Sequence, residues 1–165
     1  MPTYYHGSPK RFSQFRLNQW KRGKAIFLTD DFDDAQSYGR FVYTVKLDPG
    51  TNIFDFRSSS HINRLTTWVE AYLAKQPPYR GDNFYPFTQP QVLTGIKNGK
   101  WHYLSHPIIT KALKALRFDG WYEIESGREQ VGVSNTKKLE ILDVTDTQAV
   151  AARVVARFIG RDGGI

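Results

Sequence analysis

The chain has 165 residues, of which 40% are hydrophobic and 15% aromatic, and this predicts a folded protein with one domain over residues 1–165. It contains no cysteine, which excludes disulfide bonds and thiolate metal sites. The absence of cysteine fits the cytoplasm, where we expect the protein to act. We expect it to be a monomer. We expect neither a membrane-spanning segment nor a signal peptide, because no apolar run is long enough and the N-terminus is polar.

The net charge of +7 is concentrated near the N-terminus. Residues 1–29 contain no acidic residue and six basic ones, which are Lys10, Arg11, Arg16, Lys21, Arg22 and Lys24. The other 17 of the 23 basic residues face 16 acidic ones, so the rest of the chain carries only +1. This cluster predicts a binding surface for a phosphate or another anion, and a solvated basic loop is the alternative.

The N-terminal stretch 3–12, TYYHGSPKRF, predicts a strand that ends in a turn. Its two tyrosines favour a strand, whereas glycine, serine and proline end one. His6 and Gly7 are therefore expected at a strand end, which is a common place for ligand contacts. A hydrogen-bonded histidine of purely structural role is the alternative.

A second strand and a short helix are predicted next. Residues 25–29, AIFLT, are typical of a short strand. The stretch 30–39, DDFDDAQSYG, predicts a helix that Asp30 or Asp31 caps and that Gly39 ends. The DDFDD run lacks the ligand spacing of a calcium-binding loop, so helix capping is the better interpretation.

The middle of the chain predicts two more strands, a helix and a loop. The strands are expected over 41–49 and 52–56, and apolar residues at helical spacing predict a helix over 61–75. Residues 76–91 contain four prolines and four aromatic residues, which predicts a loop that packs against the domain.

The C-terminal part predicts two helices, separated by three strands and followed by a flexible tail at 160–165. The helices are expected at 106–118 and 147–160, and the strands at 120–124, 130–133 and 137–144. Strands outnumber helices and are expected to be mostly antiparallel, so the predicted class is α+β.

Three residues on separate predicted elements occur in the order His6, Tyr38 and Glu129. With the HGS run at 6–8 and the strand EQVGV that Glu129 begins, they resemble the His-Tyr-Glu ADP-ribosyltransferases. These form the clade of the poly(ADP-ribose) polymerases and diphtheria toxin. The interval of eleven residues between Phe27 and Tyr38 matches that family's two ring positions. The layout is most similar to the small bacterial and phage members.

The resemblance covers residues 3–57 and 117–144 and implies a fold of two small antiparallel sheets in a split sandwich, with helices around them. It also implies cleavage of the nicotinamide–ribose bond of NAD⁺, a co-substrate, and transfer of one ADP-ribose to a macromolecular acceptor. We expect that acceptor to be anionic, either an acidic protein surface or a nucleic acid. The reaction passes through an oxocarbenium-like transition state, as glycoside hydrolysis does.

The resemblance assigns roles to residues of the C-terminal strand and of the first helix. Glu129 is the catalytic carboxylate that holds the ribose and stabilises positive charge, with Glu123 and Glu125 as alternatives. Tyr38 stacks on nicotinamide, and Phe27 closes the other side of the ring.

The N-terminal strand is implied to supply the remaining contacts with NAD⁺. His6 binds a ribose hydroxyl on the adenosine side, Gly7 lets the backbone approach the carboxamide, and Ser8 completes the run. Ala35 stands where the polymerases have a serine that contacts nicotinamide. That hydrogen bond is either missing or supplied by another group, for which Ser37 is the candidate.

Two departures from the family pattern favour transfer of a single ADP-ribose over polymer formation. Gln130 replaces an aromatic residue after Glu129, and Gly132 interrupts the aliphatic run. No metal is expected, because the histidines lack the spacing of metal ligands; the three outside the N-terminal strand are His61, His102 and His106.

Two rival functions remain open. An NAD glycohydrolase uses the same residues, with water in place of the acceptor. A nucleic-acid-binding module uses the basic segment and exposed aromatic residues such as Trp20, Trp101 and Tyr103. The second rival is disfavoured, because these aromatic residues are scattered rather than interleaved with the basic segment.

Overall fold

The computed structural model describes residues 3–17, 25–75 and 89–151. The chain folds into two compact units, each built around one sheet. Of the described residues, the three-stranded unit contains 3–15, 28–48 and 139–151, and the four-stranded unit contains 16–17, 25–27, 49–75 and 89–138. The predicted class, α+β with two small and mostly antiparallel sheets, is confirmed.

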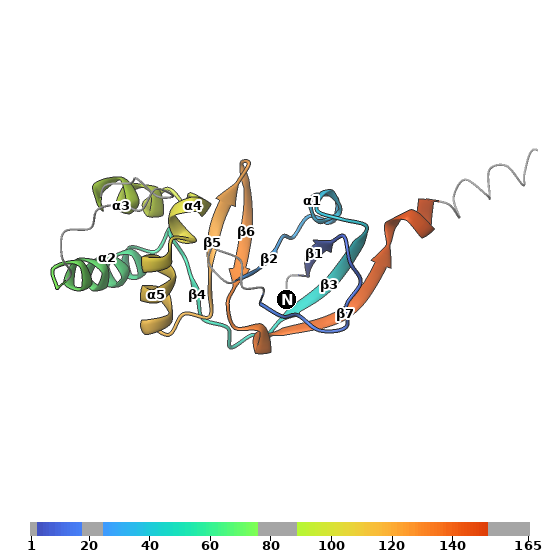
Figure 1. Cartoon of the computed structure of the whole chain (residues 1–165), viewed down its shortest axis with the longest axis horizontal. Helices are drawn as coiled ribbons and strands as arrows, with labels where there is room; N and C mark the ends of the chain where they lie inside the picture. Colours follow the sequence, from blue (N-terminus) through green and yellow to red (C-terminus); the bar gives the residue numbers. More distant parts are fainter. Residues whose placement is uncertain (1–2, 18–24, 76–88, 152–165) are drawn as a thin grey trace, which may run out of the picture. The chain divides into compact units, whose positions relative to one another are not determined.

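The sheet of the three-stranded unit has the antiparallel order β1–β3–β7 (Figure 1). Its strands are β1 (Tyr4–Ser8), β3 (Phe41–Leu47) and β7 (Leu139–Asp146). Tyr43 on β3 is fully buried, and its ring stacks on that of Phe12 at 4.1 Å. The Phe12 amide donates a hydrogen bond to the Tyr43 hydroxyl at 2.6 Å, so segment 12–15 packs on the Tyr43 side of this sheet.

Helix α1 (Phe32–Ser37) packs against β1 in the same unit. The Asp31 carboxylate accepts hydrogen bonds from the amides of Asp33 and Asp34, which confirms the predicted cap. A Cβ on Gly7 would lie 1.7 Å from the carbonyl oxygen of Ala35, so glycine is required for the helix to lie this close.

The sheet of the four-stranded unit has the order β2–β6–β5–β4, with β4 and β5 parallel (Figure 1). Its strands are β2 (Ile26–Leu28), β6 (Arg128–Val133), β5 (Gly120–Glu125) and β4 (Ile53–Phe54). Four helices of this unit lie on one side of β4 and β5: α2 (Ser59–Leu73), α3 (Gln89–Lys97), α4 (Trp101–Leu104) and α5 (Pro107–Ala115). Leu65, Ile109 and Trp121 are among the buried residues that join these helices to the sheet.

Two helices differ from the sequence prediction. Helix α4 was not predicted, and α3 begins at Gln89, inside the predicted loop 76–91, whose other residues 76–88 lie outside the described ranges. Pro90 is tolerated because the first turn of a helix needs no amide donor there. Gly95 in the interior of α3 weakens the helical pattern. It is needed because a Cβ there would lie 2.1 Å from the Tyr103 ring on α4.

The other predicted elements are present within a few residues of their expected bounds. The last helix begins at residue 147 as predicted and is described to residue 151, so its remainder and the predicted tail lie outside the described ranges. None of the helices in those ranges combines the length and apolar character that crossing a membrane requires.

Candidate functional site

The β5–β6 hairpin sets the position of Glu129. The turn consists of Ser126 and Gly127, whose φ angles are 51° and 80°, as a two-residue turn with two left-handed positions requires. This turn pairs Glu125 with Arg128 and Ile124 with Glu129. Glu129 is therefore fixed on β6, one residue beyond the strand's start.

The two faces of this hairpin carry different side chains. Trp121 pairs with Gly132, and Tyr122 pairs with Val131. Alternate residues point to opposite faces of a sheet. Trp121, Glu123 and Gly132 therefore share one face, here called the Trp121 face, which packs on the helical core. Tyr122, Ile124 and Glu129 share the other, here called the Glu129 face.

The guanidinium of Arg57 contacts the Glu129 carboxylate. Its Nη1 donates to Glu129 Oε2 at 2.8 Å, and its Nε and Nη2 donate to the two oxygens of Asp55 at 2.8 and 3.1 Å. The same guanidinium lies 5.2 Å from the centroid of the Tyr122 ring and 5.5 Å from that of Phe56. Arg57 is thus held by a two-point ion pair and by two aromatic rings.

The chain immediately after β4 places Asp55 and Arg57. The Arg57 amide donates to Asp55 Oδ1, which forms an Asx-turn, and the Asp55 amide donates to His61 Nδ1. Helix α2 begins directly afterwards with Ser58 as its N-cap. The Arg57 side chain, which donates hydrogen bonds to the carboxyl, lowers the pKa of Asp55 below its ordinary value.

The three candidate carboxylates of the hairpin have different surroundings. Glu123 is only 1% exposed and accepts a hydrogen bond from the Trp121 indole nitrogen at 2.6 Å. Burial raises its pKa to about 7, against the lowering effect of the Trp121 hydrogen bond and with a smaller raising effect of Glu125. The Glu129 side chain is 45% exposed and Glu125 is half-buried. Glu123 is therefore closed to a substrate, whereas Glu129 is open to one.

Phe27 lies on the Trp121 face. Its ring is edge-to-face with Trp121 at 6.2 Å, and a Cβ on Gly132 would lie 3.0 Å from it. The structure does not bring Phe27 and Glu129 together, because they lie on opposite faces of the four-stranded sheet.

In the three-stranded unit, Tyr38 and Gly7 lie together. Tyr38 is the C-cap of α1 and is 49% exposed, and its Cβ would lie 3.0 Å from a Cβ on Gly7. The neighbouring Ser37 is exposed as well, and its hydroxyl donates to the Asp34 carbonyl at 2.6 Å.

His6 and Ser8 have contacts within the same unit. His6 pairs with Tyr43 across the sheet and packs edge-to-face on Phe15 at 5.3 Å, on the face opposite α1. The Ser8 hydroxyl donates to the Lys10 carbonyl and accepts from the Lys10 amide, so it closes a local turn.

Sequence reasoning missed Arg57, Asp55 and Tyr122. Asp55, inside the predicted strand at 52–56, and Arg57, directly after it, were the available signal, but solvated charges are common at strand ends. Of the basic segment, Lys10, Arg11 and Arg16 are described, whereas Lys21, Arg22 and Lys24 lie outside the described ranges.

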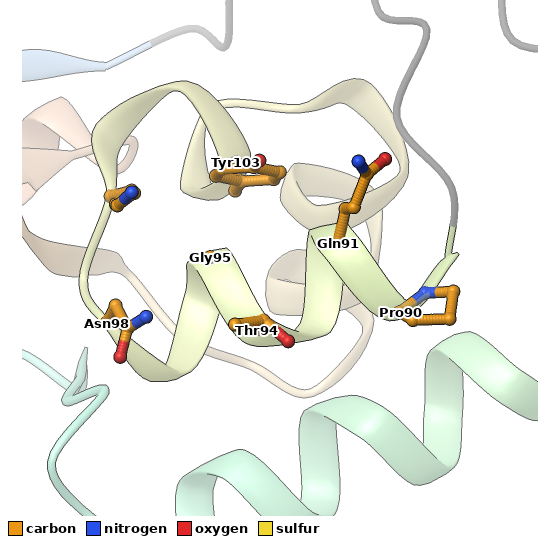
Figure 2. A pocket seen from close by; sticks show the side chains of 7 residues that line it. Pro90, Gln91, Thr94, Gly95, Asn98 and Tyr103 are labelled. Atoms are coloured by element: carbon orange, nitrogen blue, oxygen red, sulfur yellow. The ribbon is translucent and has the colours of Figure 1, made fainter.

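A pocket of about 250 Å³ lies between α3 and α4 in the four-stranded unit (Figure 2). Its lining residues are Pro90, Gln91, Thr94, Gly95, Asn98, Lys100 and Tyr103. None of the residues predicted to bind NAD⁺ lines it, and its volume is below that usual for drug-sized ligands. It is therefore a packing gap beside Gly95 rather than a candidate for the dinucleotide.

No family model and no curated protein matches the sequence. A solved structure described as that of an anti-CRISPR protein aligns with 84% of this chain and 93% of its own, at 11% identity and a TM-score of 0.56. At that identity the likeness shows a similar fold alone. The crystal structure of the M.tuberculosis MbcT-MbcA toxin-antitoxin complex aligns with 93% of this chain and 88% of its own at 14% identity. Its TM-score of 0.44 is too low to support a conclusion.

Proposed function

We propose that this protein is an NAD-dependent mono-ADP-ribosyltransferase in which Glu129 is the catalytic carboxylate. The observation that carries the proposal is the exposed Glu129 side chain, held by Arg57 at the start of β6. This is where the sequence resemblance expects the catalytic glutamate of the His-Tyr-Glu family. Of the two other glutamates on this hairpin, Glu123 is buried and Glu125 is half-buried.

The proposed reaction is a displacement at C1′ of the nicotinamide ribose. The bond between C1′ and the nicotinamide ring nitrogen breaks, and its electron pair returns to the ring, which leaves as neutral nicotinamide. A nucleophilic atom of the acceptor bonds to C1′ and loses its proton to solvent. A carboxylate beside the ribose stabilises the positive charge that develops on the sugar, which is the role of Glu129.

The contacts with NAD⁺ are proposed as well. Tyr38 has the exposed ring that stacking on nicotinamide requires, and Ser37 and Gly7 adjoin it. His6 and Ser8 are proposed from the resemblance alone. The packing of Phe27 on Trp121 favours a core role, whereas Tyr122 is an aromatic residue that does share the Glu129 face.

The biological setting and the acceptor are also proposals. We infer a cytoplasmic phage or bacterial effector, in keeping with the resemblance and with the description of one structural neighbour as an anti-CRISPR protein. Acceptor binding by the basic N-terminal segment would favour an anionic macromolecule. The rival nucleic-acid-binding module loses support, because Trp101 and Tyr103 are half-buried rather than exposed.

The proposal is tested with NAD⁺ labelled in its adenylate part, incubated with purified protein with and without cell lysate. We expect release of nicotinamide and a labelled macromolecule, which protease or nuclease digestion then assigns to protein or nucleic acid. Free ADP-ribose as the sole product would establish the NAD glycohydrolase instead. Absence of both nicotinamide release and calorimetric NAD⁺ binding would contradict the proposal.

Binding is tested separately at Tyr38. Tyr38→Ala should weaken NAD⁺ binding by about 1–3 kcal/mol, the value of a base stacked on an aromatic side chain. Tyr38→Phe keeps the ring and serves as the matched control, with affinity expected to remain close to that of the wild type. Calorimetry that shows equal affinity in the alanine variant would remove Tyr38 from the binding site.

A further inference from the structure

We propose that Arg57 is a positioning residue that holds one oxygen of Glu129 so that the other oxygen is presented to the ribose. This inference rests on the proposed function, because it concerns how the proposed catalytic carboxylate is oriented. It adds a residue that lies 72 positions before Glu129 in the sequence and that no motif indicates.

Arg57 is held in place by contacts that do not involve Glu129. Asp55 binds its Nε and Nη2 at two points, which leaves Nη1 for Glu129. The rings of Tyr122 and Phe56 hold the guanidinium at 5.2 and 5.5 Å. Because this guanidinium is already ordered, contact with it orders the glutamate at little additional entropic cost.

The two oxygens of the Glu129 carboxylate have different surroundings. Oε2 accepts the hydrogen bond from Arg57 at 2.8 Å. Within residues 3–17, 25–75 and 89–151, Oε1 has no hydrogen-bond partner. A carboxylate held at one oxygen has a defined plane, so Oε1 is available as an acceptor for a ribose hydroxyl in a defined direction.

The ion pair between Arg57 and Glu129 is exposed to solvent, which argues against a mainly stabilising role. The side chains of Arg57 and Glu129 are 52% and 45% exposed, and exposed ion pairs contribute little to folding stability. Orientation, by contrast, matters steeply for catalysis, because small misplacements of a reacting group cost large factors in rate.

The test compares Arg57→Gln with Arg64→Gln in full-length protein. Arg64 is the matched control, since its guanidinium lies 5.2 Å from the Phe118 ring and donates to the Leu116 carbonyl, away from Glu129. We expect Arg57→Gln to lower kcat roughly tenfold to a hundredfold, with KM and thermal stability little changed. Arg64→Gln should keep the wild-type kcat, and Arg57→Lys should recover part of the loss.

A double variant distinguishes positioning from a general structural effect. If Arg57 acts through Glu129, then Arg57→Gln combined with Glu129→Gln should be no slower than Glu129→Gln alone. If the two substitutions lower kcat by factors that multiply in the double variant, the inference is overturned. A wild-type kcat in Arg57→Gln would overturn it as well, and both outcomes leave the proposed function standing. Full turnover in Glu129→Gln, or none in the wild type, would overturn the proposed function and this inference with it.

Discussion

The two faces of the β5–β6 hairpin show how neighbouring glutamates acquire different properties. Glu123 is buried on the Trp121 face, where an indole N–H is its hydrogen-bond partner, and its pKa rises to about 7. Glu129 lies on the opposite face, exposed to solvent, with a guanidinium as its partner. They are only six positions apart in the sequence, and the turn at Ser126 and Gly127 assigns each to its face. The hairpin thus separates an exposed carboxylate held by a guanidinium from a buried one whose pKa is raised by burial.

The largest effect is expected at Glu129. Glu129→Gln should lower turnover by on the order of a hundredfold to a thousandfold, as the loss of a dedicated electrostatic stabiliser does, with the fold and NAD⁺ affinity retained. Nicotinamide release under saturating NAD⁺ measures this. Glu125→Gln, on the same hairpin, is the control and should retain most activity. The reverse pattern would mean that Glu125 is the catalytic carboxylate.

The second-largest effect is expected at Glu123, whose burial lowers the free energy of unfolding at neutral pH. Its pKa is raised above the ordinary value of 4.5, to about 7. Between these two values the folded state binds a proton that the unfolded state lacks. Stability therefore falls as pH rises through this window, by about 1.4 kcal/mol for each pH unit. Glu123→Gln removes the charge and keeps an acceptor for Trp121, so it should be more stable than the wild type by up to about 3 kcal/mol at pH 8.

Urea denaturation of both proteins from pH 5 to pH 8 measures this difference. Glu140→Gln is the control for the same substitution at an exposed site, because that side chain is 63% exposed. A constant difference between Glu123→Gln and wild type across this range would show that the buried carboxyl is ionised throughout.

The sequence predicted the elements of the hairpin and the position of Glu129, because strand patterns and turn residues are local. It could not predict the face on which each side chain lies. Phe27 was assigned to nicotinamide from its spacing to Tyr38, yet β2 places it against Trp121, on the face away from Glu129. Arg57 was missed because its partner is distant in sequence and the parallel pairing of β4 with β5 has no local signature.

The third prediction tests the packing of the Trp121 face. A Cβ on Gly132 would lie 3.0 Å from the rings of Phe27 and Trp121. Trp121 is 1% exposed and hydrogen-bonded to Glu123, which opposes a shift of its ring. Gly132→Ala should therefore lower the free energy of unfolding by about 1–2 kcal/mol.

Adding Phe27→Leu to Gly132→Ala should recover part of this loss, because the smaller side chain makes room for the methyl group. NAD⁺ affinity should be unchanged in the single variant, since this face is separate from Glu129. A marked loss of affinity without loss of stability would support the predicted role of Phe27 beside the nicotinamide ring.

The smallest effect is expected at the turn that separates the two faces. Ser126 has a φ of 51°, which costs most residues energy and which asparagine tolerates better than serine does. Asn-Gly is the preferred pair for a two-residue hairpin turn with two left-handed positions. Ser126→Asn should raise the free energy of unfolding by about 0.5 kcal/mol, within the range of such turn and surface optimisations.

Gly127→Ala is the opposite control, because a Cβ there meets no neighbour and only its φ of 80° opposes the substitution. The urea-denaturation midpoints of the two variants should therefore shift in opposite directions from that of the wild type. Equal stability of all three would mean that the strand pairing, rather than the turn, sets the register that places Glu129 opposite Ile124.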